Sequence, residues 1–204
     1  PHMVARISVG KNLYGALAYN QNKVDEGGAK VLSAHLLRYP EDGRFRPDES
    51  VRQFLEWMPN HYRTEKPVIH ISLNPHPDDV LTDGQLAEIG REYMQRLGYG
   101  NQPYLVFKHE DIGRHHIHIV SLRVDSEGRK VSDKFEYRRS KEITEFLEQK
   151  YGLHPAEGRK KGEEWQLKPV DVAKGDIKRQ IACTLKPLLK LYSFRTMGEL
   201  RALL

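Results

Sequence analysis

Cysteine is nearly absent from this chain, and long apolar runs are absent altogether. The sequence contains a single cysteine, Cys183. No disulfide can therefore form within the chain, which is typical of proteins from a reducing compartment. No apolar stretch approaches the roughly 18 residues that a membrane-spanning helix needs, which excludes membrane insertion. Because no secretory signal precedes the first predicted strand, we expect a cytoplasmic protein.

The overall composition is that of a folded domain. The chain has 204 residues, of which 38% are hydrophobic and 30% charged, enough for one core with a small extension. We expect residues 1–2 to be a tag remnant, residues 3–160 to form the main domain, and residues 161–204 to form a basic helical extension. A helix that begins near residue 196 runs to the last residue, so we expect the natural protein to continue.

Positive charge is concentrated in the second half of the chain. Residues 1–100 carry 12 Lys and Arg against 13 Asp and Glu, whereas residues 101–204 carry 21 against 15. Residues 168–195 alone hold seven basic side chains and two acidic ones. Such an excess suits a polyanion such as nucleic acid, although a solvated helix face has the same composition.

Strands and helices alternate along the main domain. The strand patterns cover residues 4–9, 68–73, 104–108 and 116–124. The helical patterns cover residues 12–22, 82–97 and 140–151, with weaker ones at 29–37 and 48–57. The most secure helix is the one at 82–97, because Thr82 and Gln85 form a capping-box pattern and Gly98 ends it.

Four histidines lie in the short stretch from Lys108 to Val120. His116 and His118 point to the same face of their strand, because side chains alternate along a strand. An antiparallel return after the preceding strand would bring His109 beside them. Three imidazoles with open coordination positions suit a catalytic divalent ion. Hydrogen-bonded structural histidines are the alternative.

Three further polar residues accompany this stretch. Asp111 could orient a ligating histidine or serve as a general base, or it could merely stabilise the turn. His115 points to the opposite face and could contact a phosphate or simply face solvent. His70 is a second candidate base, since it shares a strand face with Ser72, and an ordinary structural histidine is the alternative.

The histidine stretch resembles a known family. His109-Glu-Asp111 followed by His116-Ile-His118-Ile-Val is similar to the third motif of the relaxases, the HUH endonucleases that start conjugative DNA transfer from plasmids and transposons. Residues 13–19 resemble the first motif and residues 67–75 the middle one. The likeness covers roughly residues 4–155. It implies an α/β (α+β) fold, with helices packed on a mainly antiparallel sheet, and a helical C-terminal extension.

The resemblance also implies the reaction. Relaxases nick one DNA strand at an origin of transfer, where a tyrosine displaces the 3′ oxygen and forms a reversible 5′-phosphotyrosine link. Aligning the first motif selects Tyr19 as the nucleophile, and Tyr14 remains the alternative. The expected metal ligands are His109, His116 and His118, with Mg²⁺ or Mn²⁺ as the ion and Zn²⁺, Ni²⁺ or Co²⁺ as alternatives.

The same resemblance implies a bacterial protein that binds single-stranded origin DNA with an adjacent hairpin. An accessory mobilisation protein and a coupling protein or secretion channel are the expected partners, and the basic extension is the expected DNA clamp. The expected DNA contacts are Arg6, Lys11, Ser72, Lys108, Arg114, His115, Arg123, Arg138, Arg139, Lys178 and Arg179.

Three other functions remain open. A metal-dependent hydrolytic nuclease or phosphodiesterase would use the same histidines with water as nucleophile. A replication initiator or transposase of the HUH superfamily would share the chemistry, but its tyrosine usually follows the histidine motif, whereas Tyr19 precedes it. A DNA-binding module with a structural metal would have no activity.

Overall fold

The computed structural model describes residues 3–38, 46–110 and 115–154. Nine elements follow one another along this part of the chain. They are β1 (Val4–Gly10), α1 (Leu13–Asp25), β2 (Ala29–His35), α2 (Pro47–Trp57), β3 (Val68–Asn74), α3 (Asp83–Leu97), β4 (Tyr104–His109), β5 (His116–Leu122) and α4 (Glu136–Tyr151). None of the described helices is both long and apolar enough to cross a membrane.

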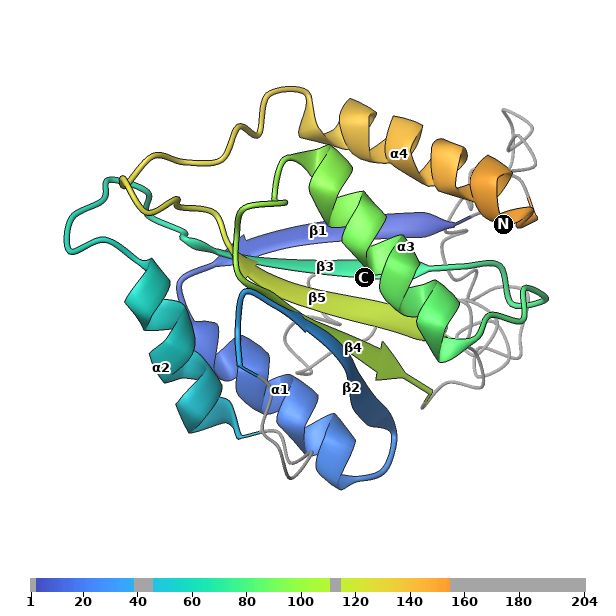
Figure 1. The fold of residues 1–204 in the computed structure, drawn as a ribbon, viewed down its shortest axis with the longest axis horizontal. Helices are drawn as coiled ribbons and strands as arrows, with labels where there is room; N and C mark the ends of the chain where they lie inside the picture. The colour runs from blue at the N-terminus through green and yellow to red at the C-terminus, as the bar shows by residue number, and fades with distance from the viewer. Residues whose placement is uncertain (1–2, 39–45, 111–114, 155–204) are drawn as a thin grey trace, which may run out of the picture. The chain divides into compact units, whose positions relative to one another are not determined.

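The five strands form one sheet in the order β1-β3-β5-β4-β2 (Figure 1). Every neighbouring pair is antiparallel. Helices pack on this sheet and complete an α+β fold, which confirms the fold class predicted from the sequence. β5, which bears two of the candidate histidines, is the central strand.

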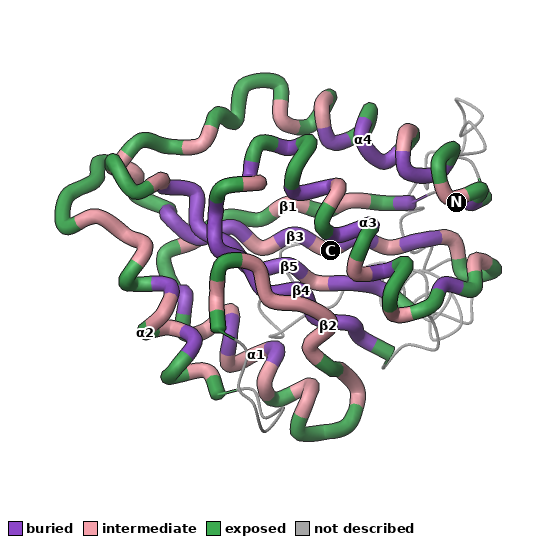
Figure 2. Tube along the Cα trace, viewed as in Figure 1, coloured by how far each residue is buried: buried purple, intermediate pink, exposed green. Residues whose placement is uncertain are grey.

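Two hydrophobic clusters lie on opposite faces of the sheet. The larger cluster joins α3 and α4 to alternate strand residues such as Ile71, Ile117 and Ile119. The smaller one joins α1 and α2 to residues of the other face, such as Phe107 and Val120. The middle of the sheet is therefore buried on both faces, as the purple segments of Figure 2 show. His116 and His118 alternate with the isoleucines and so belong to the α1 face.

Most predicted elements are confirmed. α3 begins with the full capping box of Thr82 and Gln85 and ends at Gly98 in the left-handed conformation. The helices at 12–22, 48–57 and 140–151 are present as α1, α2 and α4. All four predicted strands are present as well, and β5 ends two residues earlier than the pattern indicated.

The weak helix predicted over 29–37 is wrong, because this segment contains strand β2. Ala29 pairs with His109 and His35 with Tyr104, with a register shift between Val31 and Ser33. The Ala and Leu residues of the segment favour a helix, but pairing with the exposed edge of β4 satisfies its backbone hydrogen bonds. Tertiary context overrides a weak local preference here.

Candidate metal and DNA-nicking site

Three histidines from two neighbouring strands meet at one place. The β4–β5 register pairs His109 directly with His116, and His118 lies two residues further along β5 on the same face. One ring nitrogen from each of the three histidines lies within 4.8 Å of the others. The antiparallel return expected from the sequence is thus confirmed. This hairpin brings the three histidine rings into contact with one another.

The arrangement of the rings fits a divalent ion. The ring centroids are 3.9 Å apart for His109 and His118, 4.9 Å for His116 and His118, and 5.3 Å for His109 and His116. Nitrogens that bind one ion at about 2.1 Å lie roughly 3–4 Å from each other. The three ring nitrogens, which lie within 4.8 Å of one another, are therefore close to the separation that a shared ion requires.

His118 is held in the neutral form that a metal ligand requires. Burial disfavours the charged imidazolium, and the neighbouring His109, His70 and His116 disfavour it further, so the pKa of His118 is well below its ordinary value. The Nδ1 atom of His118 lies 2.9 Å from Nε2 of His70 on β3. If Nδ1 donates this hydrogen bond, Nε2 of His118 keeps the lone pair that an ion would use.

Tyr19 reaches this cluster from helix α1. The helix starts at the cap residue Asn12, whose side chain accepts a hydrogen bond from Gly15, and it buries Leu13 and Leu17 against the sheet. The Tyr19 ring centroid lies 6.0 Å from that of His109 and 6.4 Å from that of His118. Tyr14 is 53% exposed. The helix therefore presents one of the two candidate tyrosines, Tyr19, to the histidines.

Next to His118, the sheet has a polar face. The registers pair Arg6 with Ser72 and Ser72 with His118, so these three residues lie in a row across β1, β3 and β5. Arg6 is exposed and Ser72 half-buried, whereas Ile71 and Leu73, on the other face, are fully buried. Two predicted DNA contacts, Arg6 and Ser72, thus share the face of the histidines.

Lys108 belongs to β4, and its side chain lies on the opposite face of the sheet, beside the start of α3. Its ammonium bonds Asp83 at 2.8 Å and Glu110 at 2.7 Å. Burial lowers the pKa of Lys108, but the hydrogen bonds to the two carboxylates outweigh it and raise the pKa above its ordinary value. Hydrogen bonds from Lys108 and Lys30 lower the pKa of Asp83 to about 2. The predicted contact Lys108 therefore has two protein partners already.

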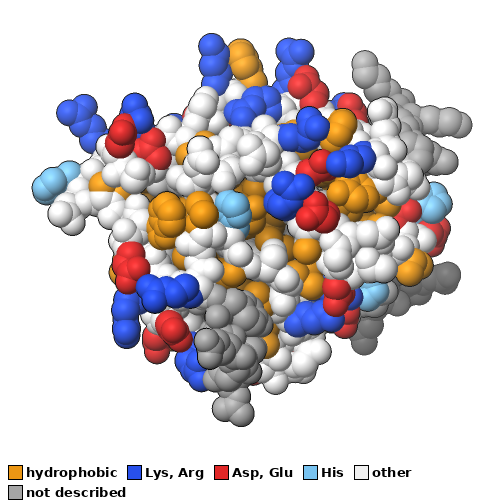
Figure 3. Space-filling model, viewed as in Figure 1, with side chains coloured by type: hydrophobic (Ala, Val, Ile, Leu, Met, Phe, Trp, Pro, Cys, Tyr) orange, Lys and Arg blue, Asp and Glu red, His pale blue; other side chains and the backbone are white. Residues whose placement is uncertain are grey.

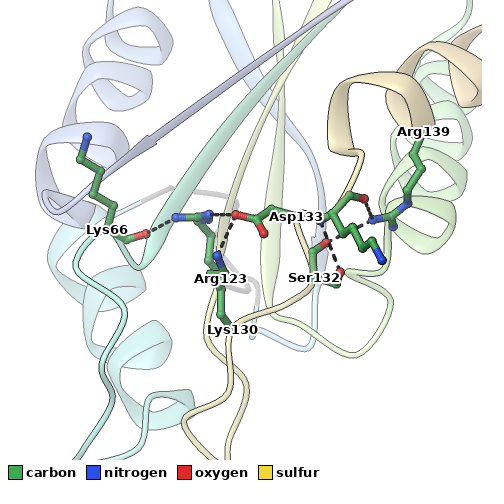
Figure 4. Close-up of polar contacts among 7 residues, drawn as sticks. Lys66, Arg123, Lys130, Ser132, Asp133 and Arg139 are labelled. Atoms are coloured by element: carbon green, nitrogen blue, oxygen red, sulfur yellow. Dashed lines mark hydrogen bonds and ion pairs between the residues drawn. The ribbon is translucent and has the colours of Figure 1, made fainter.

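Arg123 and Arg139 are held by the protein at the far end of β5 (Figure 4). Arg123 is 8% exposed and donates hydrogen bonds to the Lys66 carbonyl and the Asp133 carboxylate. Arg139 donates to the carbonyls of Leu97 and Ser132. Neither lies in the row of polar residues beside the histidines, and both tie the loop before α4 to the rest of the domain.

The remaining predicted contacts are scattered or undescribed. Arg138 pairs with Glu142 along α4. His115 is exposed with Nδ1 3.5 Å from a Glu110 oxygen, and Lys11 is exposed just after β1. Four predicted site residues and the basic extension over 161–204 lie outside the described residues. The four are Asp111, Arg114, Lys178 and Arg179.

Sequence reasoning missed Asn20. This side chain is fully buried, and its Oδ1 atom lies 2.8 Å from Nε2 of His109. The missed signal was its position in the helix. Leu13, Leu17 and Asn20 are the buried residues of α1, at helical spacing, so a polar residue occupies a place in an apolar stripe.

These observations define an α+β protein with a three-histidine cluster suited to a divalent ion and a tyrosine beside it. The comparisons with known proteins give the family. The model of the nuclease domain of MobA/VirD2-like relaxases matches residues 19–153, about two thirds of the chain. The chain therefore belongs to this relaxase family and is a DNA-nicking enzyme. A search of curated proteins finds no match.

Proposed function

We propose that this relaxase nicks one strand of single-stranded DNA at an origin of transfer by transesterification to Tyr19. The Tyr19 hydroxyl oxygen attacks the scissile phosphorus, a P–Oη bond forms, and the P–O3′ bond breaks. The Tyr19 hydroxyl gives up its proton and the leaving 3′ oxygen takes one up, so the products are a 5′-phosphotyrosine link and a free 3′-hydroxyl. The observation that carries this proposal is the placement of the Tyr19 ring about 6 Å from two rings of the histidine cluster.

The site must overcome the low reactivity of tyrosine. Its hydroxyl has an ordinary pKa of about 10, and the phosphodiester oxygens repel an incoming phenolate. His109, His116 and His118 would hold a divalent ion, which polarises the phosphate and neutralises the developing charge. We propose Mg²⁺ or Mn²⁺, with Zn²⁺, Ni²⁺ or Co²⁺ as alternatives. The protein itself supplies the three imidazoles and fixes the tyrosine through the buried face of α1.

The polar face beside the histidines is the proposed path of the DNA strand. Arg6 would contact a phosphate and Ser72 would donate a hydrogen bond next to His118, so the strand would cross β1 and β3 toward Tyr19. On the opposite face, over α3 and α4, basic and acidic side chains are intermixed, which suits a polyanion less well (Figure 3). We further propose that residues 3–160 are the catalytic domain and residues 161–204 a clamp.

Membership of the relaxase family also supports a proposal about the protein partners. A relaxase acts on an origin of transfer, so we propose that an accessory mobilisation protein helps to expose the single strand there. A coupling protein and a secretion channel would then receive the tyrosine-linked DNA. This reaction would take place in the bacterial cytoplasm, where plasmid and transposon DNA resides.

A denaturing gel tests the proposal. The full chain is incubated with labelled single-stranded origin DNA and Mn²⁺, and part of each sample is treated with protease. We expect a shifted band that protease removes, together with a shortened fragment bearing a 3′-hydroxyl. Shortened DNA without the shifted band would show hydrolysis by water, and unchanged DNA would show binding only. Either result would overturn the tyrosine mechanism.

A second sample separates the relaxase from a replication initiator or transposase with the same chemistry. The covalent complex is mixed with a second oligonucleotide that ends in a 3′-hydroxyl at the nick position. The relaxase is expected to rejoin the strands and to depend on the sequence of the transfer origin. Activity on a replication origin or a transposon end, with none on the transfer origin, would favour the other members of the superfamily.

A further inference from the structure

Asn20 occupies an unusual place for an amide side chain. It continues the buried face of α1 that Leu13 and Leu17 begin, and it is completely buried. A buried amide costs free energy unless its hydrogen bonds are made. Asn20 makes two of them at 2.8 Å, one to the backbone carbonyl of Ala16 and one to the ring of His109.

These two hydrogen bonds determine which way the amide points. The Ala16 carbonyl can only accept, so the NH₂ group of Asn20 must face it. The amide oxygen therefore points toward His109, and this oxygen can only accept a hydrogen bond. His109 must therefore donate from Nε2, which carries the ring proton. In a neutral imidazole the other nitrogen, Nδ1, then bears the lone pair.

We propose that Asn20 is a positioning residue that fixes the tautomer and orientation of His109 so that Nδ1 faces the ion. This inference rests on the proposed metal site. A ligating histidine commonly donates its second ring N–H to a neighbouring acceptor, which holds the ring and makes the ligating nitrogen more basic. Here the acceptor is supplied by the helix that carries Tyr19, and the two residues are adjacent. Helix α1 would thus carry the nucleophile Tyr19 and also position the metal ligand His109.

Imidazole ¹⁵N spectra of the metal-free full chain provide the first test. The His109 signals are assigned by their loss in a His109→Gln variant. We expect the wild-type protein to carry the His109 proton on Nε2. A proton on Nδ1 would overturn the proposal without any variant of Asn20 being needed.

Metal affinity of matched variants provides the second test, with Co²⁺ as the probe at mildly alkaline pH. Asn20→Leu removes the acceptor at similar volume and is expected to weaken Co²⁺ binding about tenfold to hundredfold. Asn20→Asp keeps an acceptor for His109 but loses the bond to Ala16. It is expected to retain the Nε2–H tautomer and wild-type affinity. If Asn20→Asp binds as weakly as Asn20→Leu, Asn20 matters only for the helix.

Two controls separate the possible failures. Asn12→Ala loosens the start of α1 without touching His109, so its Co²⁺ affinity should stay at the wild-type value. His116→Ala removes a proposed ligand and should abolish tight binding. If wild type and His116→Ala bind Co²⁺ alike, the metal site itself fails. If His116→Ala loses binding but a folded Asn20→Leu binds like wild type, the metal site stands and the role of Asn20 is overturned.

Discussion

The ring of Tyr19 lies 6.0 Å, centroid to centroid, from the ring of His109, although the two residues are 90 positions apart in the chain. Helix α1 reaches the histidines because it runs back beneath the sheet after β1 and packs Leu13 and Leu17 against it. A separation of 6.0 Å between tilted rings is that of an ordinary aromatic contact, so the phenol ring packs directly beside the histidine cluster.

Replacing Tyr19 by Phe should abolish nicking, because the attacking oxygen is lost while the ring and the fold remain. We expect the rate of covalent complex formation to fall by about a thousandfold or more. Tyr14→Phe is the matched control on the same helix and should react like wild type, since Tyr14 is exposed. Both variants are assayed on denaturing gels. A covalent complex that persists in Tyr19→Phe and disappears in Tyr14→Phe would reverse the assignment.

Arg6 should contribute to DNA binding through a phosphate contact. Arg6→Ala is expected to weaken binding of single-stranded DNA and to reduce the slope of log affinity against log salt by about 0.7, the value for one phosphate contact. Fluorescence anisotropy over a salt series measures both quantities. Arg91→Ala on α3, whose guanidinium pairs with Glu88 on the other face of the sheet, is the control. Equal slopes for the two variants would place the strand elsewhere.

The sequence was informative where chemistry and local pattern coincide. α3 could be predicted because Thr82, Gln85 and Gly98 mark its ends locally. The histidine cluster could be predicted because a hairpin return follows from strand periodicity and a short connection. In both cases the residues that decide the structure lie within a single helix with its caps or a single hairpin.

Features that depend on distant segments could not be predicted in this way. β2 is a strand because it pairs with the free edge of β4, and nothing within residues 29–35 indicates that this edge is available. The partners of Arg123 are Lys66 and Asp133, one of which is 57 positions away. The link from Asn20 to His109 joins α1 to β4. Which polar residue becomes a structural partner is therefore decided by packing.

Arg123 should be needed for stability more than for DNA binding. Its guanidinium is mostly buried between the Lys66 carbonyl and Asp133, and truncation would remove one donor from each, leaving Asp133 with its bond from Lys130. We expect Arg123→Ala to lower the free energy of unfolding by about 2–3 kcal/mol in urea titrations. Arg129→Ala, at an exposed position close by, should change it by less than about 0.5 kcal/mol. An unchanged stability of Arg123→Ala, with weakened DNA binding, would support the original prediction of a phosphate contact.

The Asp79–His154 pair should make stability depend on pH. Asp79 lies in the loop between β3 and α3 and bonds both the backbone N–H and the ring Nδ1 of His154, which follows α4. The hydrogen bond to Asp79 raises the pKa of His154 above its ordinary value of 6.5. A raised pKa in the folded state means that the folded protein holds the proton more tightly than the unfolded chain. The stabilisation is therefore full below pH 6.5 and is lost as the pH rises through the folded-state pKa.

Two measurements check this pair. Proton NMR titration should place the His154 pKa above 6.5 in the wild-type protein and nearer to 6.5 in Asp79→Asn, because the neutral amide no longer favours the charged ring. Chemical unfolding should show wild type more stable than Asp79→Asn in mild acid, with the difference shrinking as the pH is raised. Identical His154 titrations in the two proteins would show that Asp79 does not hold the charged ring in solution.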